Sequence, residues 1–429
     1  MLSSVGQLSK KYSDKLVDLN DHHHLMSTRT YDKQDMSDLF PMFQRFTRRF
    51  VNKLFERKEV SQSRKLLDCY MGSGNTLVGC VEHGKIGYGI DISPLFCFVA
   101  HVKTTKYSAQ DFDEALSGVE TAEESEEVDV PALSSFHTLF TQRRLDQLFS
   151  MKHVAFALEE KPKELLLFAL VSELLRFSRA KRYGKGLHKK KTYERLNMKK
   201  AVIEKLKDIK IAQKNFYQNV PETGNSIILQ GDARDIGSVE NRYNHSDLLP
   251  IEDIDTVITS PPYCNSADYV EMYKLELWFL DFVKNYKEFK KISHSTIRSH
   301  LTLSRESKVE WTNPVIDDIC EQLGKNEIWN KNIPSMIKGY FDDMHRTLGE
   351  LKQVIRNKGN IFVVIGNSCY SGIVIPSDLL IAEAANDLGF TVNHIERARS
   401  LATSGQQLIK LDKNSKQLLR ESIVVLNPN

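Results

Sequence analysis

The chain has 429 residues, of which 41% are hydrophobic and 27% are charged. This length predicts about two to three domain-sized units, or one large domain with insertions. No apolar run approaches the ~18 residues of a membrane span and the first residues lack an apolar secretory signal, so we expect a cytoplasmic protein with no membrane association. The six cysteines contain no C-x-x-C pair, which favours reduced thiols over a zinc module or a disulfide frame. Because the net charge is only +3, any affinity for nucleic acid must come from local clusters of charge.

The N-terminal region contains a polar stretch and then an amphipathic pattern. Residues 1–30 are polar, and His22–His24 are better explained as a solvated loop than as a metal site, since no second ligand cluster is nearby. From Asp38 to Glu56 apolar residues recur at spacings of three and four, which predicts a helix.

A glycine-rich turn follows the first predicted strand, Lys65–Asp68. Gly72 and Gly74 let the backbone approach a ligand where a side chain would intrude. About fifteen residues later the next predicted strand ends on Asp91, where an acid can accept hydrogen bonds from ribose hydroxyls. Leu77 occupies the place of a third glycine, and no Gly-Lys-Ser/Thr follows. The pattern therefore indicates a nucleoside site, neither a dinucleotide fingerprint nor a phosphate loop.

Residues 106–218 have a different composition and are predicted to be a helical insertion. Asp111–Asp129 contains nine acidic residues and no Lys or Arg, which predicts a solvated linker or surface helix, and helical spacing returns over Leu139–Leu175. Arg176–Lys200 contains eleven Lys or Arg residues and one acid, so it is either a phosphate-binding segment or a solvated lysine-rich loop. The candidate DNA contacts are Arg179, Lys181, Arg182, Lys185, Lys189, Lys190 and Lys191.

The α/β pattern resumes after the insertion and predicts a doubly wound sheet of seven strands. Their expected centres are Leu66, Tyr88, Ile228, Val257, Ile361, Val392 and Val424. We divide the chain into 1–105 and 219–429, which together form the sheet domain, and the insertion between them. A smaller polar insertion is expected at 284–330.

Several predicted strands carry functional groups at their carboxyl ends, where open α/β sheets bind ligands. Asp91 and Asp232 could hold the ribose and the base amino group of a nucleoside. Ser260–Tyr263 follows a buried strand, and its two prolines stiffen the backbone. This loop could grip a planar group that carries an amine, although a simple strand-ending turn is the alternative.

Two segments resemble the amino-group DNA methyltransferases that use S-adenosyl-L-methionine. They are Asp68-Cys69-Tyr70-Met71-Gly72-Ser73-Gly74-Asn75-Thr76 and Thr259-Ser260-Pro261-Pro262-Tyr263. The resemblance covers residues ~35–105 and ~225–429. Thr-Ser-Pro-Pro-Tyr looks most like the branch that methylates N4 of cytosine, whereas the adenine-N6 branch more often has Asp or Asn before the prolines. Cys69-Tyr70 stands where the family usually has Pro-Phe, and Asn75 where it usually has Thr.

The resemblance implies a Rossmann-like methyltransferase fold, S-adenosyl-L-methionine as cofactor, no metal, and double-stranded DNA with a flipped base as substrate. It implies a catalytic loop of Ser260, Pro261, Pro262 and Tyr263. The implied cofactor-binding residues are Asp68, Tyr70, Gly72, Ser73, Gly74, Thr76, Asp91, Ile92, Asp232, Ala233 and Phe43. A restriction-modification system would add a cognate restriction endonuclease as a functional partner.

The alternatives to an N4-cytosine enzyme are an N6-adenine DNA methyltransferase, an RNA or protein-glutamine methyltransferase, and a nucleic-acid-binding protein with a degenerate cofactor fold. Ser260 argues against the RNA and protein enzymes, which more often have Asn or Asp before the prolines.

Overall fold

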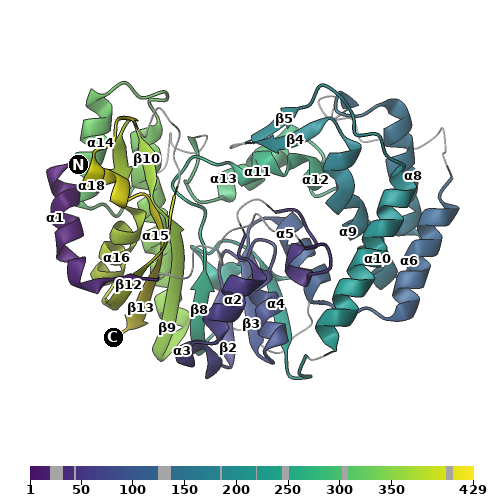
Figure 1. The fold of residues 1–429 in the computed structure, drawn as a ribbon, viewed down its shortest axis with the longest axis horizontal. Coiled ribbons are helices and arrows are strands. Elements are labelled where there is room, and N and C mark those ends of the chain that lie inside the picture. The colour runs from purple at the N-terminus through teal and green to yellow at the C-terminus, as the bar shows by residue number, and fades with distance from the viewer. Residues whose placement is uncertain are drawn as a thin grey trace.

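The computed structural model describes residues 1–19, 32–42, 45–123, 137–183, 186–218, 220–243, 251–301, 308–401 and 409–429. His22–His24, Phe43 and Lys185 lie outside the described residues. Figure 1 shows a central sheet with helices on both faces and a group of long helices at the end of the molecule opposite both termini. None of the helices in these ranges is long and apolar enough to cross a bilayer.

The central sheet has nine strands in the order β1-β12-β13-β9-β8-β2-β3-β6-β7. In this order they are Leu16–Asp18, Phe390–Ser400, Arg420–Pro428, Ile355–Gly366, Ile254–Thr259, Lys65–Asp68, Ile86–Asp91, Asn225–Gln230 and Glu240–Asn241. The five strands β9, β8, β2, β3 and β6 pair in parallel, whereas β13 is antiparallel to both of its neighbours. All seven expected strands are present and form the centre of the sheet.

The two additional strands, β1 and β7, lie at the edges and have only three and two residues. The sequence did not predict them because a strand this short has too few residues for an alternating pattern.

Side chains of β8 alternate between two cores, which explains its continuous apolar run. Val257 packs into one core with the helices α15, Ile333–Val354, and α16, Ser377–Asp387, whereas Ile258 packs into another with α2, Arg48–Phe55. A strand covered on both faces needs apolar residues at successive positions. Other helices of this part are α1 Ser3–Lys11, α3 Lys58–Ser61, α4 Asn75–Glu82, α5 Pro94–Thr104, α14 Pro314–Lys325 and α18 Lys413–Gln417.

The helix expected from Asp38 to Glu56 is wrong in extent. A 3-10 turn covers Met36–Asp38, and the α-helix begins only at Arg48, after the N-cap Thr47, whose hydroxyl accepts from the Phe50 amide at 3.1 Å. Pro41 disfavours helical geometry at the residue before it, so the apolar spacing continues past residues 39–42, which lie outside any helix.

The described residues between 106 and 218 form four long helices around a leucine-rich core. They are α6 Ala109–Thr121, α8 Gln142–Phe156, α9 Glu160–Phe177 and α10 Met198–Tyr217. The basic segment, interpreted from the sequence as either a phosphate-binding segment or a solvated loop, contains a two-stranded hairpin, β4 Ala180–Tyr183 with β5 Gly186–Lys189. Strand β5 packs near α11, Tyr269–Met272, which is followed by α12 Lys274–Phe279 and α13 Tyr286–Ser295. The remaining elements are the 3-10 turns Ser13–Lys15 and Ile236–Ser238 and the hairpin β10 Ser368–Tyr370 with β11 Ile373–Ile375.

Candidate active site

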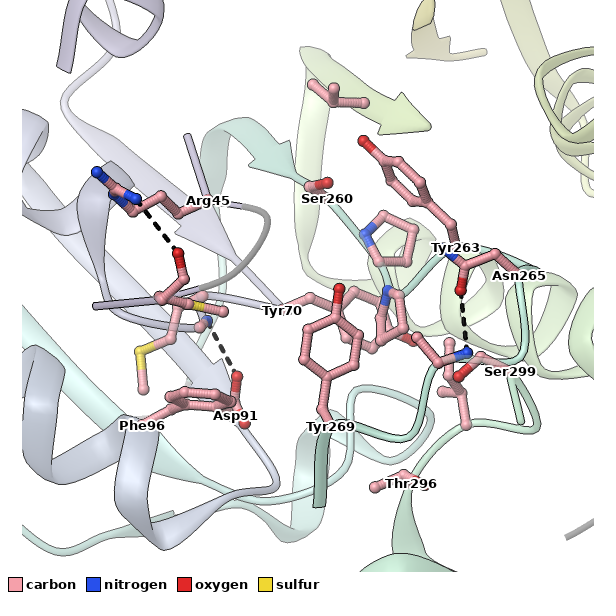
Figure 2. A pocket seen from close by; sticks show the side chains of 18 of the residues that line it. Arg45, Tyr70, Asp91, Phe96, Ser260, Tyr263, Asn265, Tyr269, Thr296 and Ser299 are labelled. Atoms are coloured by element: carbon pink, nitrogen blue, oxygen red, sulfur yellow. Dashed lines mark hydrogen bonds between the residues drawn. The ribbon is translucent and has the colours of Figure 1, made fainter. Parts of the chain in front are cut away.

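A cavity of about 660 Å³ lies at the carboxyl ends of the central strands. Figure 2 shows side chains from the glycine-rich turn, from β3 and from the Ser260–Tyr263 loop converging on it. The predicted site residues that line the cavity are Asp68, Tyr70, Gly72, Ser73, Asp91, Ile92, Asp232, Ala233, Ser260, Pro261, Pro262 and Tyr263. Gly74 and Thr76 were also predicted as contacts, but they are not part of the wall.

Asp91 holds the glycine-rich turn against the end of β3. Its carboxylate accepts hydrogen bonds from the amides of Gly72, at 3.0 Å, and Ser93, at 2.9 Å. Gly72 has φ +50°, a left-handed conformation that glycine adopts without strain. Burial disfavours the charged carboxylate and raises the pKa of Asp91 to about 7. Asp91 lines the cavity, so its carboxylate can accept further hydrogen bonds from a ligand.

Gly74 and Thr76 shape the turn from behind. Gly74 has φ +75°, and a Cβ added there would lie 2.6 Å from that of Ala100 on α5. The Thr76 hydroxyl donates to Asp68 at 2.7 Å, and Asp68 also accepts from Thr259 Oγ1 at 2.9 Å. Burial raises the pKa of Asp68 to about 6. Thr76 and Thr259 therefore fix Asp68 between the turn and β8.

The two departures from the family pattern both have partners in this fold. Tyr70 lines the cavity, and its hydroxyl lies 2.8 Å from Thr347 Oγ1 on α15. Asn75 donates to the Phe46 carbonyl at 2.6 Å and accepts from Lys103 Nζ. A phenylalanine at 70 would lack the hydroxyl of the first contact, and Asn75 makes the other two through the separate nitrogen and oxygen of its amide.

Lys103 is a functional candidate that the sequence reasoning missed. Its side chain is completely buried, and its ammonium donates to the Ser73 carbonyl at 2.8 Å as well as to Asn75. Burial lowers the pKa of Lys103 to about 7. The signal that could have drawn attention to it is a lysine directly after the stretch Pro94–Val102, which is apolar except for His101.

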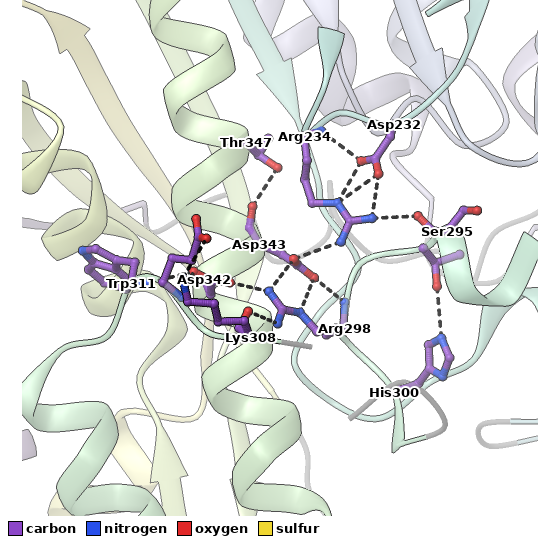
Figure 3. Close-up of polar contacts among 12 residues, drawn as sticks. Asp232, Arg234, Ser295, Arg298, His300, Lys308, Trp311, Asp342, Asp343 and Thr347 are labelled. Carbon is purple, nitrogen blue, oxygen red and sulfur yellow. Dashed lines mark hydrogen bonds and ion pairs between the residues drawn. The ribbon is translucent and has the colours of Figure 1, made fainter. Parts of the chain in front are cut away.

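Asp232, which was predicted to accept from a base amine, also has a partner within its own chain. It lines the cavity, but both of its oxygens accept from Arg234, with Nη2 at 2.6 Å from Oδ2 and Nε at 2.9 Å from Oδ1. Arg234 also pairs with Asp343 at 2.9 Å, and Asp343 accepts from Arg298 Nη2 at 2.8 Å. Figure 3 shows this chain of alternating charges running from β6 to the segment after α13. Asp232 is therefore already paired with a cation of its own chain.

The segment after α13 forms a wall of the cavity that no sequence motif predicted. Ser295, Thr296, Ile297, Ser299 and His300 line the cavity. The Ser299 carbonyl accepts from the Ser266 amide at 3.0 Å, which joins this wall to the chain just after the proline loop. His300 is buried, which lowers its pKa, and its Nε2 lies 3.0 Å from Thr296 Oγ1. These residues are distant from the proline loop in sequence, so only the tertiary structure brings them to the site.

The proline loop brings its aromatic ring against the sheet. Pro261 is buried and the Tyr263 carbonyl accepts from the Asn265 amide at 2.7 Å. The Tyr263 hydroxyl donates to Glu421 on β13, a residue that lines the cavity. Tyr269 supplies a second aromatic ring to the cavity wall, as Figure 2 shows. The loop thus offers a serine hydroxyl, proline carbonyls and aromatic surface to one ligand-sized space.

The basic residues of the β4–β5 hairpin and its flanks fall into two groups. Lys181, Lys189 and Lys191 are exposed. The Arg182 side chain is only 9% exposed, pairs with Glu276 and stacks its guanidinium 3.9 Å from the Tyr273 ring. Arg179 donates to the Thr138 carbonyl at 3.0 Å, and Lys190 to the Leu175 carbonyl at 3.5 Å. The hairpin is thus anchored by some of its cations and presents others to solvent.

No family model matches the chain. The chain is 24% identical to the Type II methyltransferase M.AvaI of Nostoc sp., over 80% of this chain and 77% of that protein. It is 26% identical to the Type II methyltransferase M.BsoBI of Geobacillus stearothermophilus, over 94% and 87% of the two chains. Against the Type II methyltransferase M.MvaI of Kocuria varians the identity is 22%, over 90% and 88%. This similarity along most of its length and the mostly parallel α/β sheet support a DNA methyltransferase family for the chain.

Proposed function

We propose that the protein is a site-specific DNA methyltransferase that transfers a methyl group to the N4 amine of a flipped cytosine, within a restriction-modification system. The observation that carries the proposal is a single cavity lined by both the Gly72–Asp91 nucleoside site and the Ser260–Tyr263 loop. Two planar ligands can meet there, one on each side of the ends of β2 and β8.

The residues on the first side fit S-adenosyl-L-methionine. Asp91 accepts from the backbone amides of Gly72 and Ser93 and keeps acceptor capacity for ribose hydroxyls. Gly72 and Ser73 form a turn in which the backbone itself meets the ligand, and Phe96 and Ile92 give apolar surface for a base. When bound, the cofactor would supply an electrophilic methyl group on a sulfonium. The volume of about 660 Å³ is that of a pocket for ligands of this size.

The residues on the second side fit an exocyclic amine. Such an amine is a poor nucleophile because its lone pair is delocalised into the ring. Hydrogen bonds from its two N–H groups to the Ser260 hydroxyl and the Pro261 carbonyl favour a pyramidal nitrogen with an available lone pair. The Tyr263 ring can stack on the base and stabilise the positive charge that develops on the amine. Positioning of the two reactants accounts for most of the expected rate acceleration.

The product ammonium is acidic, so it loses a proton without a strong general base. The target base must leave the duplex to enter the cavity, and this costs a few kcal/mol that contacts to the DNA must offset. Those contacts have candidate sources on two elements beside the cavity.

The first candidate is the β4–β5 hairpin with the residues that follow it, which carry the exposed Lys181, Lys189 and Lys191. The second is α13, whose Lys287, Lys290 and Lys291 are exposed and lie on one helix face. The C-terminus of α13 continues directly into the cavity wall, and Arg182 joins the hairpin to the Met272 carbonyl on α11 at 3.0 Å. A duplex whose flipped base enters the cavity would pass close to both elements, and their cations would contact its phosphates.

The test is methyl transfer from labelled S-adenosyl-L-methionine to duplex DNA, with RNA as the competing substrate. Hydrolysis of the product DNA then identifies the modified nucleoside. N4-methylcytosine is the expected product, because Ser260 precedes the prolines. If the product is N6-methyladenine, the target base in the proposal becomes adenine. Methylation of RNA, or no transfer at all, would refute the proposal.

The DNA surface is tested separately by the salt dependence of binding. The triple replacement of Lys189, Lys190 and Lys191 by Gln is expected to lower the slope of log affinity against log salt by about 1 for each phosphate that the variant no longer neutralises. Lys53→Gln with Lys58→Gln is the control, since both residues are exposed and neither lines the cavity. An unchanged slope in the triple variant would remove the hairpin from the interface.

A further inference from the structure

Glu421 lies in register between two strands that border the cavity. On β13 it pairs with Gly366 of β9 on one side and with Arg399 of β12 on the other. Its side chain is 5% exposed, and one carboxylate oxygen accepts from Arg399 Nε while the other accepts from the Tyr263 hydroxyl. A buried carboxylate in this position is stabilised by one charged donor and one neutral donor.

Gly366 allows the Tyr263 ring to approach Glu421. A Cβ added to Gly366 would lie 2.6 Å from Tyr263 Cε2 and 2.7 Å from Cδ2, so the ring rests directly on the backbone of β9. Any larger residue would push the ring off the sheet and out of reach of the carboxylate. Gly366 and Glu421 together fix both the plane and the hydroxyl direction of Tyr263.

The direction of the hydrogen bonds along this group follows from charge. Burial, reinforced by the Glu421 charge, raises the pKa of Tyr263 well above its usual value of 10, so the hydroxyl keeps its proton and donates to Glu421. The hydrogen bond to Glu421 and the contact with the Gly366 backbone therefore hold the Tyr263 ring in one orientation at the cavity wall. Figure 2 shows this ring beside Ser260.

We infer that Glu421 is a positioning residue that acts through Tyr263 and holds its ring in the orientation in which it stacks on the flipped base. The inference rests on the proposed function, because it concerns where the target base is held. Arg399 Nε donates to the other carboxylate oxygen and so orients the carboxylate. Without Glu421 the Tyr263 hydroxyl would lose its acceptor, and the ring would no longer be held in one orientation.

The experiment measures single-turnover methyl transfer at saturating cofactor. Tyr263→Phe removes the hydroxyl but keeps the stacking ring, and Glu421→Leu removes the acceptor. Each is expected to slow transfer about three- to tenfold, the size of one hydrogen bond, without changing cofactor affinity. The double variant is expected to be no slower than either single variant, since both substitutions break the same hydrogen bond between Tyr263 and Glu421. Glu421→Gln retains an amide oxygen that can accept from Tyr263, so its rate is expected between those of wild type and Glu421→Leu.

The chain contains a matched control far from the cavity. The Tyr12 hydroxyl donates to Glu383 at 2.7 Å, and Tyr12 is buried, so Tyr12→Phe removes an equivalent hydrogen bond. It is expected to lower thermal stability without slowing transfer. Losses that multiply in the double variant, or wild-type transfer by Tyr263→Phe, would overturn the role of Glu421 while leaving the proposed function intact. A wild-type protein that methylates no DNA would overturn both.

Discussion

Replacement of Asp91 by Asn gives the sharpest test of the cofactor site. The amide keeps the size of the carboxylate, and its oxygen can still accept from the Ser93 or Gly72 amides. It removes the negative charge that would accept from ribose hydroxyls. A hydrogen bond to a charged group contributes about 1.5–3 kcal/mol, so cofactor affinity should fall roughly 10- to 150-fold.

The pH dependence adds an independent measure of the same group. Asp91 has a pKa of about 7 in the ligand-free protein, and its ionised form is the one that accepts from the cofactor. Below this pKa the binding-competent fraction falls, so affinity at pH 6 should be about tenfold weaker than at high pH. Asp91→Asn should lose this weakening at low pH; Lys103, whose pKa is also about 7, loses its ammonium as pH rises, so its titration changes the affinity in the opposite direction. Asp68, with a pKa of about 6, is half ionised at pH 6, so its titration changes the ionised fraction only about twofold over this window.

The pH dependence of folding stability does not mimic the pH dependence of cofactor affinity, because the two have opposite signs. The folded pKa values of Asp68 and Asp91 lie above the ordinary value of 3.8, so between about pH 4 and 7 the folded chain binds more protons than the unfolded chain. These groups therefore contribute most to stability at low pH and lose that contribution as pH rises towards 7. Titration calorimetry from pH 6 to 8 measures the affinity. The assignment of the ribose to Asp91 would be refuted if Asp91→Asn and wild type had equal affinities, or if their affinities changed equally with pH.

Three other variants test separate parts of the site. Ser260→Ala should slow transfer about tenfold with unchanged cofactor affinity in calorimetry, and a wild-type rate would exclude Ser260 from the amine site. Lys103→Met removes the ammonium that holds the Ser73 carbonyl, so it should raise the cofactor Kd several-fold; an unchanged Kd would show that the turn is held by Asp91 alone. Arg182→Ala leaves the buried carboxylate of Glu276 without its cation and should destabilise the fold by about 3–5 kcal/mol in urea titration. The double variant Arg182→Ala, Glu276→Gln should recover part of that loss, and no recovery would contradict the ion-pair explanation.

The sequence by itself determined the main part of the sheet. Buried strands such as Ile254–Thr259 are continuous apolar runs, and the polar residue after each run marks its carboxyl end. The same local signal placed Asp91 and Ser260 at the ligand-binding edge, because parallel strands all end on that edge. The short β1 and β7, and the true start of α2 at Arg48, were not predicted because a few residues or a capping threonine carry little periodic signal.

Only the tertiary structure decided which groups share the cavity and which are already paired. Asp232 and Arg182 have the same local appearance as free functional residues, yet Arg234 and Glu276 pair with them in the fold. Glu421 enters the site for the opposite reason, since β13 inserts antiparallel between β9 and β12 and carries a carboxylate to the proline loop 158 positions away in sequence. Hydrogen bonds and ion pairs act over a few ångströms in space, so their partners are fixed by strand order, which the local pattern of residues does not contain.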